Sequence, residues 1–351
     1  MLTPPLVALA VIGLASGFAV ASEPPAAIRR SMSELAPLAK IHLGKTADWV
    51  AIIDAAVWVG TTGPDGVAEI DARTNAVRAA VPLPGKPCAG LAVGFGALWV
   101  PLCAKPNALA RVDLQTRGVT LLPNVGPADR EGGITTSADS VWLVIDGRAT
   151  LARIDPQTLR VRQRIAVPRG SLNPLYSDGL IWVTRSTGAE VTAISADSGA
   201  LIATVRSGPK PRFLAGGAGS VWTLNQGDGT LTRIDAQSER AIGTTPLWTP
   251  GHGGDVKFQH NIVWTTMAKV PLSATDGTTG KLLCQWTGPG GDSLDVSHDA
   301  IWLTDYDAGD IYKFALDDAL SHCMEHHGAV SSPPPAHQDP TMDRADDAAG
   351  S

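Results

Sequence analysis

Seven tryptophans recur along this chain at nearly constant spacing: Trp58, Trp99, Trp142, Trp182, Trp222, Trp264 and Trp302. The intervals between them are 41, 43, 40, 40, 42 and 38 residues. A repeat of about 40 residues is typical of solenoids, arrays and propellers, in which each unit packs only against its neighbours. This period constrains the fold more strongly than any local motif.

One repeat predicts four short strands. The run 141–145 around Trp142 is apolar, 150–155 and 160–167 alternate between polar and apolar residues, and 172–177 leads into the next tryptophan strand. Gly, Pro, Asp and Asn separate the runs. The sequence therefore predicts an all-β chain that forms a seven-bladed β-propeller of four-stranded blades. We expect each tryptophan to fill the space between blades, and each Asp before a turn to cap it.

The ring needs a strand from the opposite end of the chain to close. The last repeat supplies three strands, near 292–297, 300–304 and 310–315, while 39–46 resembles the fourth strand of a repeat. We therefore expect the N-terminal segment to be the outer strand of blade seven, and the propeller to span residues 37–323.

Both ends of the chain differ from the repeats in composition. Residues 1–21 hold a 16-residue apolar run, 6–21, that ends in Ala19-Val20-Ala21, which predicts a cleaved signal peptide. Residues 22–36 read as a linker and 324–351, rich in Pro, Ala and Asp, as a disordered tail. These features predict a periplasmic or secreted monomer with no membrane span in the mature chain.

Export permits disulfides, and the chain has four cysteines. Cys88 and Cys103 are placed symmetrically about the turn 94–97, which predicts that they are bridged across a hairpin. A second bridge between Cys284 and Cys323 is expected at the outer edge of the last blades. The alternative for Cys323 is a metal site within 322–327, where His, Cys and Met concentrate.

Candidate ligand-binding residues lie in the loops that join one blade to the next. Counting back nine to eleven positions from each tryptophan gives Asp48, Cys88, Glu131, Asn173, Arg212, Asp255 and Asp292. Lys86, Arg130, Lys210 and His252 lie just above them, and the loop between the second and third strands of blade seven adds Asp305, Tyr306 and Asp307. We expect these side chains to converge at one mouth of the central channel.

Charge at this mouth would suit a polar ligand or a cation. Glu131, Asp255 and Asp292 could hold Mg²⁺ or Ca²⁺ through carboxylate oxygens, although the cofactor is unknown from sequence. The chain has a net charge of −6 and no basic stripe, so nucleic acid is not an expected partner.

The repeat as a whole resembles a known family. Val-Trp, then Leu-x-Arg-Ile-Asp, Pro-x-Thr, a Val/Ile-rich strand and a Gly-Pro loop are similar, over about 37–315, to YVTN-type bacterial propellers and to the streptogramin (virginiamycin B) lyase group. The lyase resemblance implies ring opening of a cyclic ester with Mg²⁺, a His base and a nearby Glu/His pair. His252 and Glu131 are the His and Glu at the proposed mouth, but no Glu-x-His element matches. Lactonase-type propellers, more remotely similar, imply a Ca²⁺ site of Glu, Asn and Asp, types that Glu131, Asn173 and Asp255 supply without the family's spacing.

Two functions remain from the sequence. The first is an exported binding propeller that presents its mouth to a small polar ligand, a cation or an envelope protein. The alternative is a metal-assisted lyase or hydrolase in which a Mg²⁺ or Ca²⁺ ion activates water or a carbonyl and His252 moves the proton. A purely structural role in an envelope assembly is a third possibility.

Overall fold

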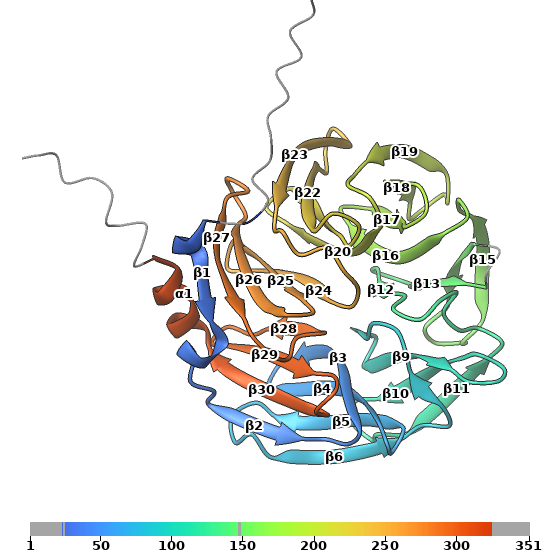
Figure 1. Cartoon of the computed structure of the whole chain (residues 1–351). Helices are drawn as coiled ribbons and strands as arrows, with labels where there is room; N and C mark the ends of the chain where they lie inside the picture. Colours follow the sequence, from blue (N-terminus) through green and yellow to red (C-terminus); the bar gives the residue numbers. More distant parts are fainter. Residues whose placement is uncertain (1–22, 24, 147–148, 325–351) are drawn as a thin grey trace, which may run out of the picture.

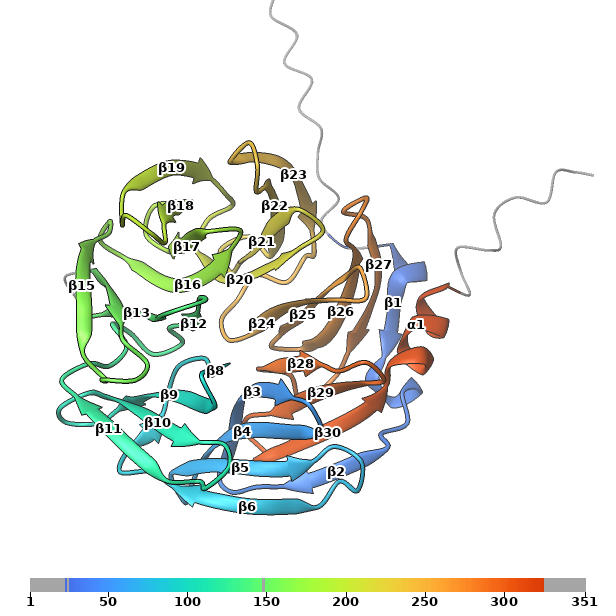
Figure 2. The ribbon, with the colours of Figure 1, turned by 180° about the vertical axis from the view of Figure 1, so that it is seen from behind.

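Seven antiparallel sheets surround a central axis in the computed structural model, which describes residues 23, 25–146 and 149–324 (Figures 1 and 2). The expected signal peptide and tail lie outside the described residues, except for Met324. The sheets are the blades of a seven-bladed β-propeller, which confirms the predicted fold class.

Within a blade the strands run outward from the axis in chain order. Blade one consists of β3 (Thr46–Ile53), β4 (Ala56–Thr62), β5 (Gly66–Asp71) and β6 (Val77–Pro82). Blade two consists of β7 (Lys86–Pro87) and β8 (Ala92–Gly94), which both pair with β9 (Ala97–Cys103), followed by β10 (Ala108–Asp113) and β11 (Val119–Pro123). Blade three consists of β12 (Ile134–Thr136), β13 (Val141–Ile145), β14 (Thr150–Ile154) and β15 (Val161–Ala166).

Blades four to six repeat this order, whereas blade seven takes its outermost strand, β2, from the start of the chain. Blade four consists of β16 (Ser171–Ser177), β17 (Leu180–Arg185), β18 (Glu190–Ser195) and β19 (Leu201–Arg206), and blade five of β20 (Pro211–Gly217), β21 (Ser220–Asn225), β22 (Thr230–Asp235) and β23 (Arg240–Pro246). Blade six consists of β24 (Asp255–Gln259), β25 (Ile262–Met267), β26 (Val270–Asp276) and β27 (Leu282–Thr287). Blade seven consists of β28 (Leu294–Val296), β29 (Ala300–Asp305), β30 (Asp310–Ala315) and β2 (Ala39–His42).

The N-terminal strand closes the ring as predicted. β2 pairs antiparallel with β30, with Ile41 opposite Ile311, so blade seven is built from both ends of the chain. Just before it, the Leu38 amide donates to the Lys313 carbonyl at 2.7 Å. Because every blade then has two neighbours, all seven can bury both faces.

The seven repeated tryptophans are packing residues. Each is at most 1% exposed, which is consistent with the expected role of filling the space between blades. The repeated Asp residues cap turns, also as expected. Asp71 accepts from the amides of Arg73 and Thr74 at 2.8 and 2.9 Å, and these amides, together with Arg78, hold its pKa at about 2.

Both predicted disulfides are present. Cys88 and Cys103 have their Cα atoms 5.8 Å apart, although they are not directly opposite. Ala92 faces Trp99, in the expected register, whereas Lys86 faces Cys103. The irregular stretch between β7 and β8 thus shifts the register by two residues, and the bridge joins diagonal neighbours.

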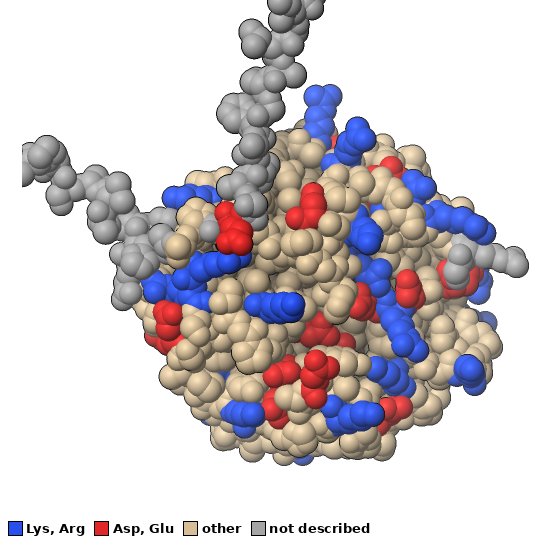
Figure 3. Space-filling model, in the orientation of Figure 1, with Lys and Arg blue, Asp and Glu red and all other residues tan. Residues whose placement is uncertain are grey.

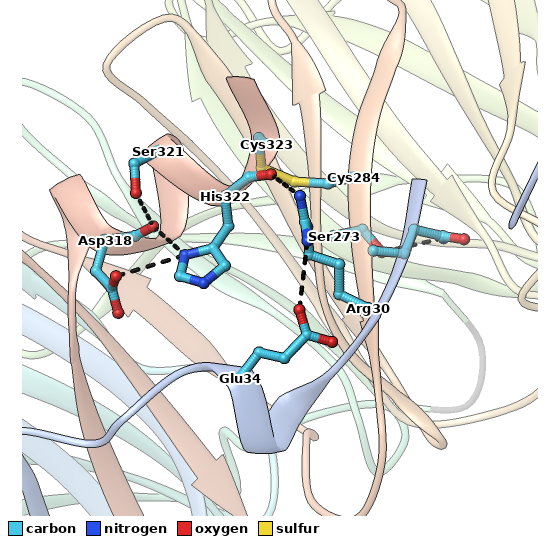
Figure 4. The surroundings of a disulfide bond; sticks show 9 residues. Arg30, Glu34, Ser273, Cys284, Asp318, Ser321, His322 and Cys323 are labelled. Carbon is cyan, nitrogen blue, oxygen red and sulfur yellow. Dashed lines mark hydrogen bonds and ion pairs between the residues drawn. A yellow bond between two sulfur atoms is a disulfide. The ribbon is translucent and has the colours of Figure 1, made fainter. Parts of the chain in front are cut away.

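The second disulfide holds an element that the sequence did not predict. Helix α1 (Leu316–Met324) follows blade seven and is joined to β27 by Cys284–Cys323, whose Cα atoms are 5.3 Å apart (Figure 4). The bridge places Cys323 in a disulfide, so this residue is not a ligand of the metal site considered for 322–327, most of which lies outside the described residues.

The N-terminal segment is docked against the same strand. β1 (Arg29–Ser31), which lies within the expected linker, pairs parallel with β27 as a fifth strand of blade six. Arg30 donates to the His322 carbonyl at 2.5 Å and forms an ion pair with Glu34 at 3.3 Å, so it ties β1 to α1 (Figure 4). Both ends of the propeller therefore meet at β27.

Candidate functional site

A cavity of about 860 Å³ opens at one mouth of the central channel. Its walls are β7 with the residue that follows it, the interblade loops before β12, β24 and β28, the first half of β3, and the loops that follow β25 and β29. In Figure 3, Asp and Glu side chains gather near the centre of one face, over β3, β28 and β29, and Lys and Arg surround them. The two predicted loop sets therefore share one mouth.

Most of the predicted site residues lie at this cavity. The lining includes Asp48, Lys86, Cys88, Arg130, Glu131, His252, Asp292, Asp305, Tyr306 and Asp307. Asn173 and Asp255 do not reach it and line a second cavity of about 270 Å³ deeper in the channel. Arg212 lines neither cavity, and it reaches Glu131 at 3.2 Å and the Arg130 carbonyl at 2.6 Å.

Trp49 separates the two cavities, and it was not among the site residues predicted from the sequence. It lines both, is 5% exposed, and packs against Phe213 with ring centroids 6.2 Å apart. A register shift between Asp48 and Val50 gives Trp49 a positive φ of 58°, which an L-residue seldom adopts. The sequence signal that could have found it is its position nine residues before Trp58, outside the 40-residue period of the other tryptophans.

Two carboxylates at the base of the mouth share a desolvated environment. Burial, and then the charge of Asp292, raise the pKa of Asp48 well above its ordinary value. Burial raises the pKa of Asp292 to about 6, assisted by the charges of Glu131 and Asp255 and opposed by the Gly254 amide. Asp48 accepts from the Trp49 amide at 2.8 Å, and Asp292 accepts from Gly254 at 3.1 Å. The second oxygen of each carboxylate has no hydrogen-bond donor among the residues that the structure describes.

The basic groups of the mouth fall into two sets. Lys86 donates to the Tyr306 hydroxyl at 2.9 Å and lies over its ring, and Arg212 is paired with Glu131. Arg130, His252 and Lys269 form no side-chain hydrogen bond or ion pair with the described part of the chain, although His252 lowers the pKa of Asp292 through its charge. The protein's own cations thus leave Asp48 and Asp292 without an ion-pair partner.

The arrangement does not fit the metal site considered for Glu131, Asp255 and Asp292. Glu131 is paired with Arg212, whereas Asp255 accepts from the Ser293 hydroxyl at 2.9 Å and lies 3.7 Å from Lys257. Within residues 23, 25–146 and 149–324, no group of three or more His, Cys, Asp or Glu side chains is arranged to hold a metal ion. No catalytic step through a metal is therefore derived.

The channel lining differs between its two sides. The innermost strands of blades six, seven and one carry Asp255, Asp295 and Asp48, Asp292 lies just before β28, and Lys257 is a basic residue among them. The innermost segments of blades two to five carry Leu91, Ile134, Leu175, Phe213 and Leu214 at the inner cavity. We call these the acidic wall and the apolar wall.

The acidic wall is joined by hydrogen bonds across blade boundaries. Ser293 accepts from the Val50 amide at 3.1 Å, and Asp295 accepts from the Ile52 amide at 2.9 Å. Burial raises the pKa of Asp295, although Lys257 counteracts it. Burial would lower the pKa of Lys257, but Asp255 and Asp295 raise it overall. This wall coincides with the seam where the ring closes.

Comparisons with known proteins identify the fold alone. The chain matches no protein-family model, and a search of curated proteins finds no relative. Among solved structures 1577 chains match, so the architecture is too widespread to identify a function. One of them, the crystal structure of BamB from Moraxella catarrhalis, aligns with a TM-score of 0.59 at 13% identity, covering 80% of this chain and 100% of that chain. The resemblance to YVTN-type and lyase-like propellers is not confirmed by these comparisons.

Proposed function

We propose that this chain is an exported β-propeller binding protein whose acidic channel mouth receives a small polar ligand, preferably one that carries a positive charge. The observation that carries the proposal is the pair Asp48 and Asp292, which lie at the base of a cavity of about 860 Å³ without a protein cation bound to either. A ligand site is expected in such a concave region with a few convergent polar groups and perturbed pKa values.

Electrostatics favour a cationic ligand over an anionic one. A positive group beside the two carboxylates would offset the burial, and the repulsion from neighbouring carboxylates, that raise their pKa values, and would favour their charged forms. The basic side chains of Arg130, His252 and Lys269 also line the cavity, where they could contact an anionic part of the same ligand. Tyr306 and Trp49 add aromatic surface, which attracts organic cations.

Export to the periplasm or beyond is part of the proposal. Two disulfides are formed, and such bonds persist in oxidising compartments. No helix in the described ranges is long and apolar enough to cross a membrane. The expected signal peptide over 1–21 supports the same placement, and an envelope protein is a further partner that this site could bind.

The metal-assisted lyase or hydrolase has less support. Its ligands Glu131 and Asp255 are already bonded to protein groups, and its proposed base His252 lies at the mouth without a hydrogen bond to any of the proposed ligands. No observation in the structure favours this second function over binding.

Calorimetric titration of the purified chain would test the binding function, with putrescine, glycine betaine, succinate, Mg²⁺ and Ca²⁺ as separate probes. We expect an organic cation to bind, and Asp48→Asn combined with Asp292→Asn to weaken that binding about tenfold or more. Asp197→Asn is the matched control, because Asp197 is exposed in a turn on the opposite face. Binding of succinate alone, or equal binding by the double variant, would contradict the proposal.

A further inference from the structure

The outermost strands of the seven blades differ in how their free edges are protected. An edge strand exposes unpaired backbone N–H and C=O groups, and proteins usually protect it with charged side chains, a β-bulge or a covering segment. The outermost strands β2, β6, β15, β19 and β23 each carry at least one Lys or Arg. β11 and β27 carry no charged residue, so their edges need another form of protection.

The edge of β27 is covered by other parts of the chain. β1 pairs with it in parallel register, from Arg29 opposite Gln285 to Ser31 opposite Thr287. Helix α1 packs against it as well and is joined to it by the Cys284–Cys323 disulfide (Figure 4). In blade six, an outer edge without charge is thus covered by an additional strand.

β11 has neither a covering segment nor a β-bulge within the described part of the chain. It is the terminal strand of its sheet, and its pairing with β10 is regular, whereas the pairings of β6, β15, β19, β23 and β27 each contain a register shift. Its sequence is Val-Thr-Leu-Leu-Pro, in which Val119 is 38% and Leu121 is 42% exposed. Figures 1 and 2 both place β11 at the rim of the ring, on the side away from β27, β1 and α1.

The backbone groups that β11 leaves free follow from its pairing with β10. The Asp113 amide donates to the Gly118 carbonyl at 2.9 Å, where the hairpin of β10 and β11 turns. In an antiparallel pair, opposite residues are alternately hydrogen-bonded and not hydrogen-bonded. Thr120 therefore bonds to β10, and the N–H and C=O groups of Val119 and Leu121 point outward, away from the sheet.

This pattern of free groups is complementary to itself. If two copies of β11 run antiparallel about a two-fold axis at Thr120, Val119 of each copy lies opposite Leu121 of the other. Both residues of each such pair then donate and accept one backbone hydrogen bond, so every free group of Val119 and Leu121 is bonded. On the side chains, the same register brings the two Thr120 residues together and places Val119 against Leu121, and both are favourable cross-strand pairs.

We propose that two copies of this chain associate through β11, so that blade two of one copy and blade two of the other form one continuous antiparallel sheet. A second copy fits this edge because the strand is uncharged, although the chain as a whole carries a net charge of −6. A two-fold axis is also the usual symmetry of a dimer, in which the same surface of each copy meets the other.

The dimer is expected to be weak. Two convex rims that meet at one strand each bury less than the roughly 1,200 Å² of a stable, specific interface, so association depends on concentration. The chain, expected to be a monomer from its sequence, would then be one only at low concentration. The proposal does not rest on the proposed function, because β11 lies at the rim and the acidic mouth lies at the centre of the ring.

Thiol trapping tests the proposed register. The two Thr120 residues form a pair that is not hydrogen-bonded, with Cα atoms about 4.5 Å apart, which a disulfide can span. Thr120→Cys, oxidised with copper–phenanthroline, should therefore give a covalent dimer in about tenfold higher yield than Thr204→Cys at the same concentration. Thr204 is the matched control, because it is exposed in β19, an outer strand that carries Arg206 and a β-bulge. Equal yields from the two variants would overturn the proposal.

Sedimentation equilibrium tests the association without a cross-link. Between about 10 μM and about 1 mM, the mean mass of the wild-type chain should rise above that of one copy. Leu121→Lys should abolish this rise because it places a charge on the free edge, and Leu201→Lys, the same change in β19, should retain it. Both leucines are exposed, so neither variant loses a core side chain, and circular dichroism verifies that both fold. A wild-type chain that stays monomeric at the highest concentration, or a Leu121→Lys variant that associates as strongly, would show that β11 does not bind a second copy.

Discussion

The acidic wall and the apolar wall occupy equivalent positions in equivalent blades, yet they hold the ring together in different ways. The apolar wall packs side chains such as Phe213 and Leu214 along the channel. The acidic wall instead crosses blade boundaries with hydrogen bonds, which the Val50 amide donates to Ser293 and the Ile52 amide donates to Asp295. Apolar packing does not depend on pH, whereas the acidic wall includes a hydrogen bond to the carboxyl group of Asp295, which titrates.

This difference places the titratable side chains of the channel in the blades next to the point where the ring closes. Blade seven is completed by the N-terminal strand β2, and blade one begins directly after it. The carboxylates at the mouth, Asp48 and Asp292, therefore lie in blades one and seven, on either side of the boundary between the first and the last blade. A ligand bound there would contact both sides of the seam and would stabilise closure by binding only the folded ring.

The largest expected effect is in the apolar wall. Phe213→Ala should lower the free energy of unfolding by about 3–5 kcal/mol, since a buried ring that packs on Trp49 is replaced by a cavity. The loss should be the same at pH 5 and pH 8, because no charged group is removed. Urea unfolding at both pH values measures it, and a loss that varied strongly with pH would break the contrast between the walls.

A smaller effect of opposite sign is expected in the acidic wall. The pKa of Asp292 is about 6 in the folded chain and near the ordinary value of about 3.9 when unfolded, so the folded state retains the proton between these values. Stability from this group should therefore be present at low pH and should fall as pH rises through about 4 to 6. Asp292→Asn, which cannot ionise, should stabilise the chain by about 1–3 kcal/mol at pH 7.5.

The control for Asp292→Asn is the same measurement at pH 4, where Asp292 is uncharged in the folded chain and about half protonated in the unfolded chain, so the difference should nearly vanish. Asp197→Asn should change stability by less than about 0.5 kcal/mol at either pH, because it is an exposed substitution. A destabilised Asp292→Asn at pH 7.5 would mean that the bond from Gly254 outweighs the repulsion.

The architecture could be read from the sequence because its cause repeats seven times. Every tryptophan fills the same space between blades, so its period survives even where strands and loops differ. The closing strand was predictable because Ile41 continues the alternation of an outer strand and blade seven lacked one. The terminal elements β1 and α1 were not, since their positions depend on contacts with β27 rather than on a repeated pattern.

The candidate site was predicted in outline but not in depth. Counting back from the tryptophans places Asn173 and Asp255 nine residues away, whereas Asp48 and Asp292 lie ten away and Glu131 eleven. Each residue of a strand spans about 3.3 Å, so Asn173 and Asp255, which are closer to their tryptophans, lie deeper in the channel and line the second cavity. Trp49 was not predicted because its place in the channel depends on a β-bulge between Asp48 and Val50. The position of such a bulge is a property of the backbone geometry and cannot be read from the sequence.

Lys257→Met tests whether the acidic wall depends on its cation. The side chain lies near Asp255 and Asp295, and its loss would leave these carboxylates without their neighbouring positive charge. We expect a loss of about 1–2 kcal/mol at pH 7.5 and a smaller loss at pH 4, where Asp295 is protonated in part. Thermal unfolding across this range measures it. Equal losses at both pH values would assign the effect to packing of the lysine stem.

The smallest expected effect concerns the link between blade three and blade five across the mouth. Glu131→Gln removes the ion pair with Arg212, but the Glu131 side chain is 36% exposed, so the free energy of unfolding should change by no more than about 1 kcal/mol. The informative readout is ligand binding. Loss of one negative charge, together with release of the Arg212 guanidinium, should weaken binding of putrescine several-fold, whereas Asp197→Asn should leave it unchanged. If putrescine binding were unaffected, the cation at the mouth would be held by Asp48 and Asp292 alone, and the acidic wall would account for the whole site.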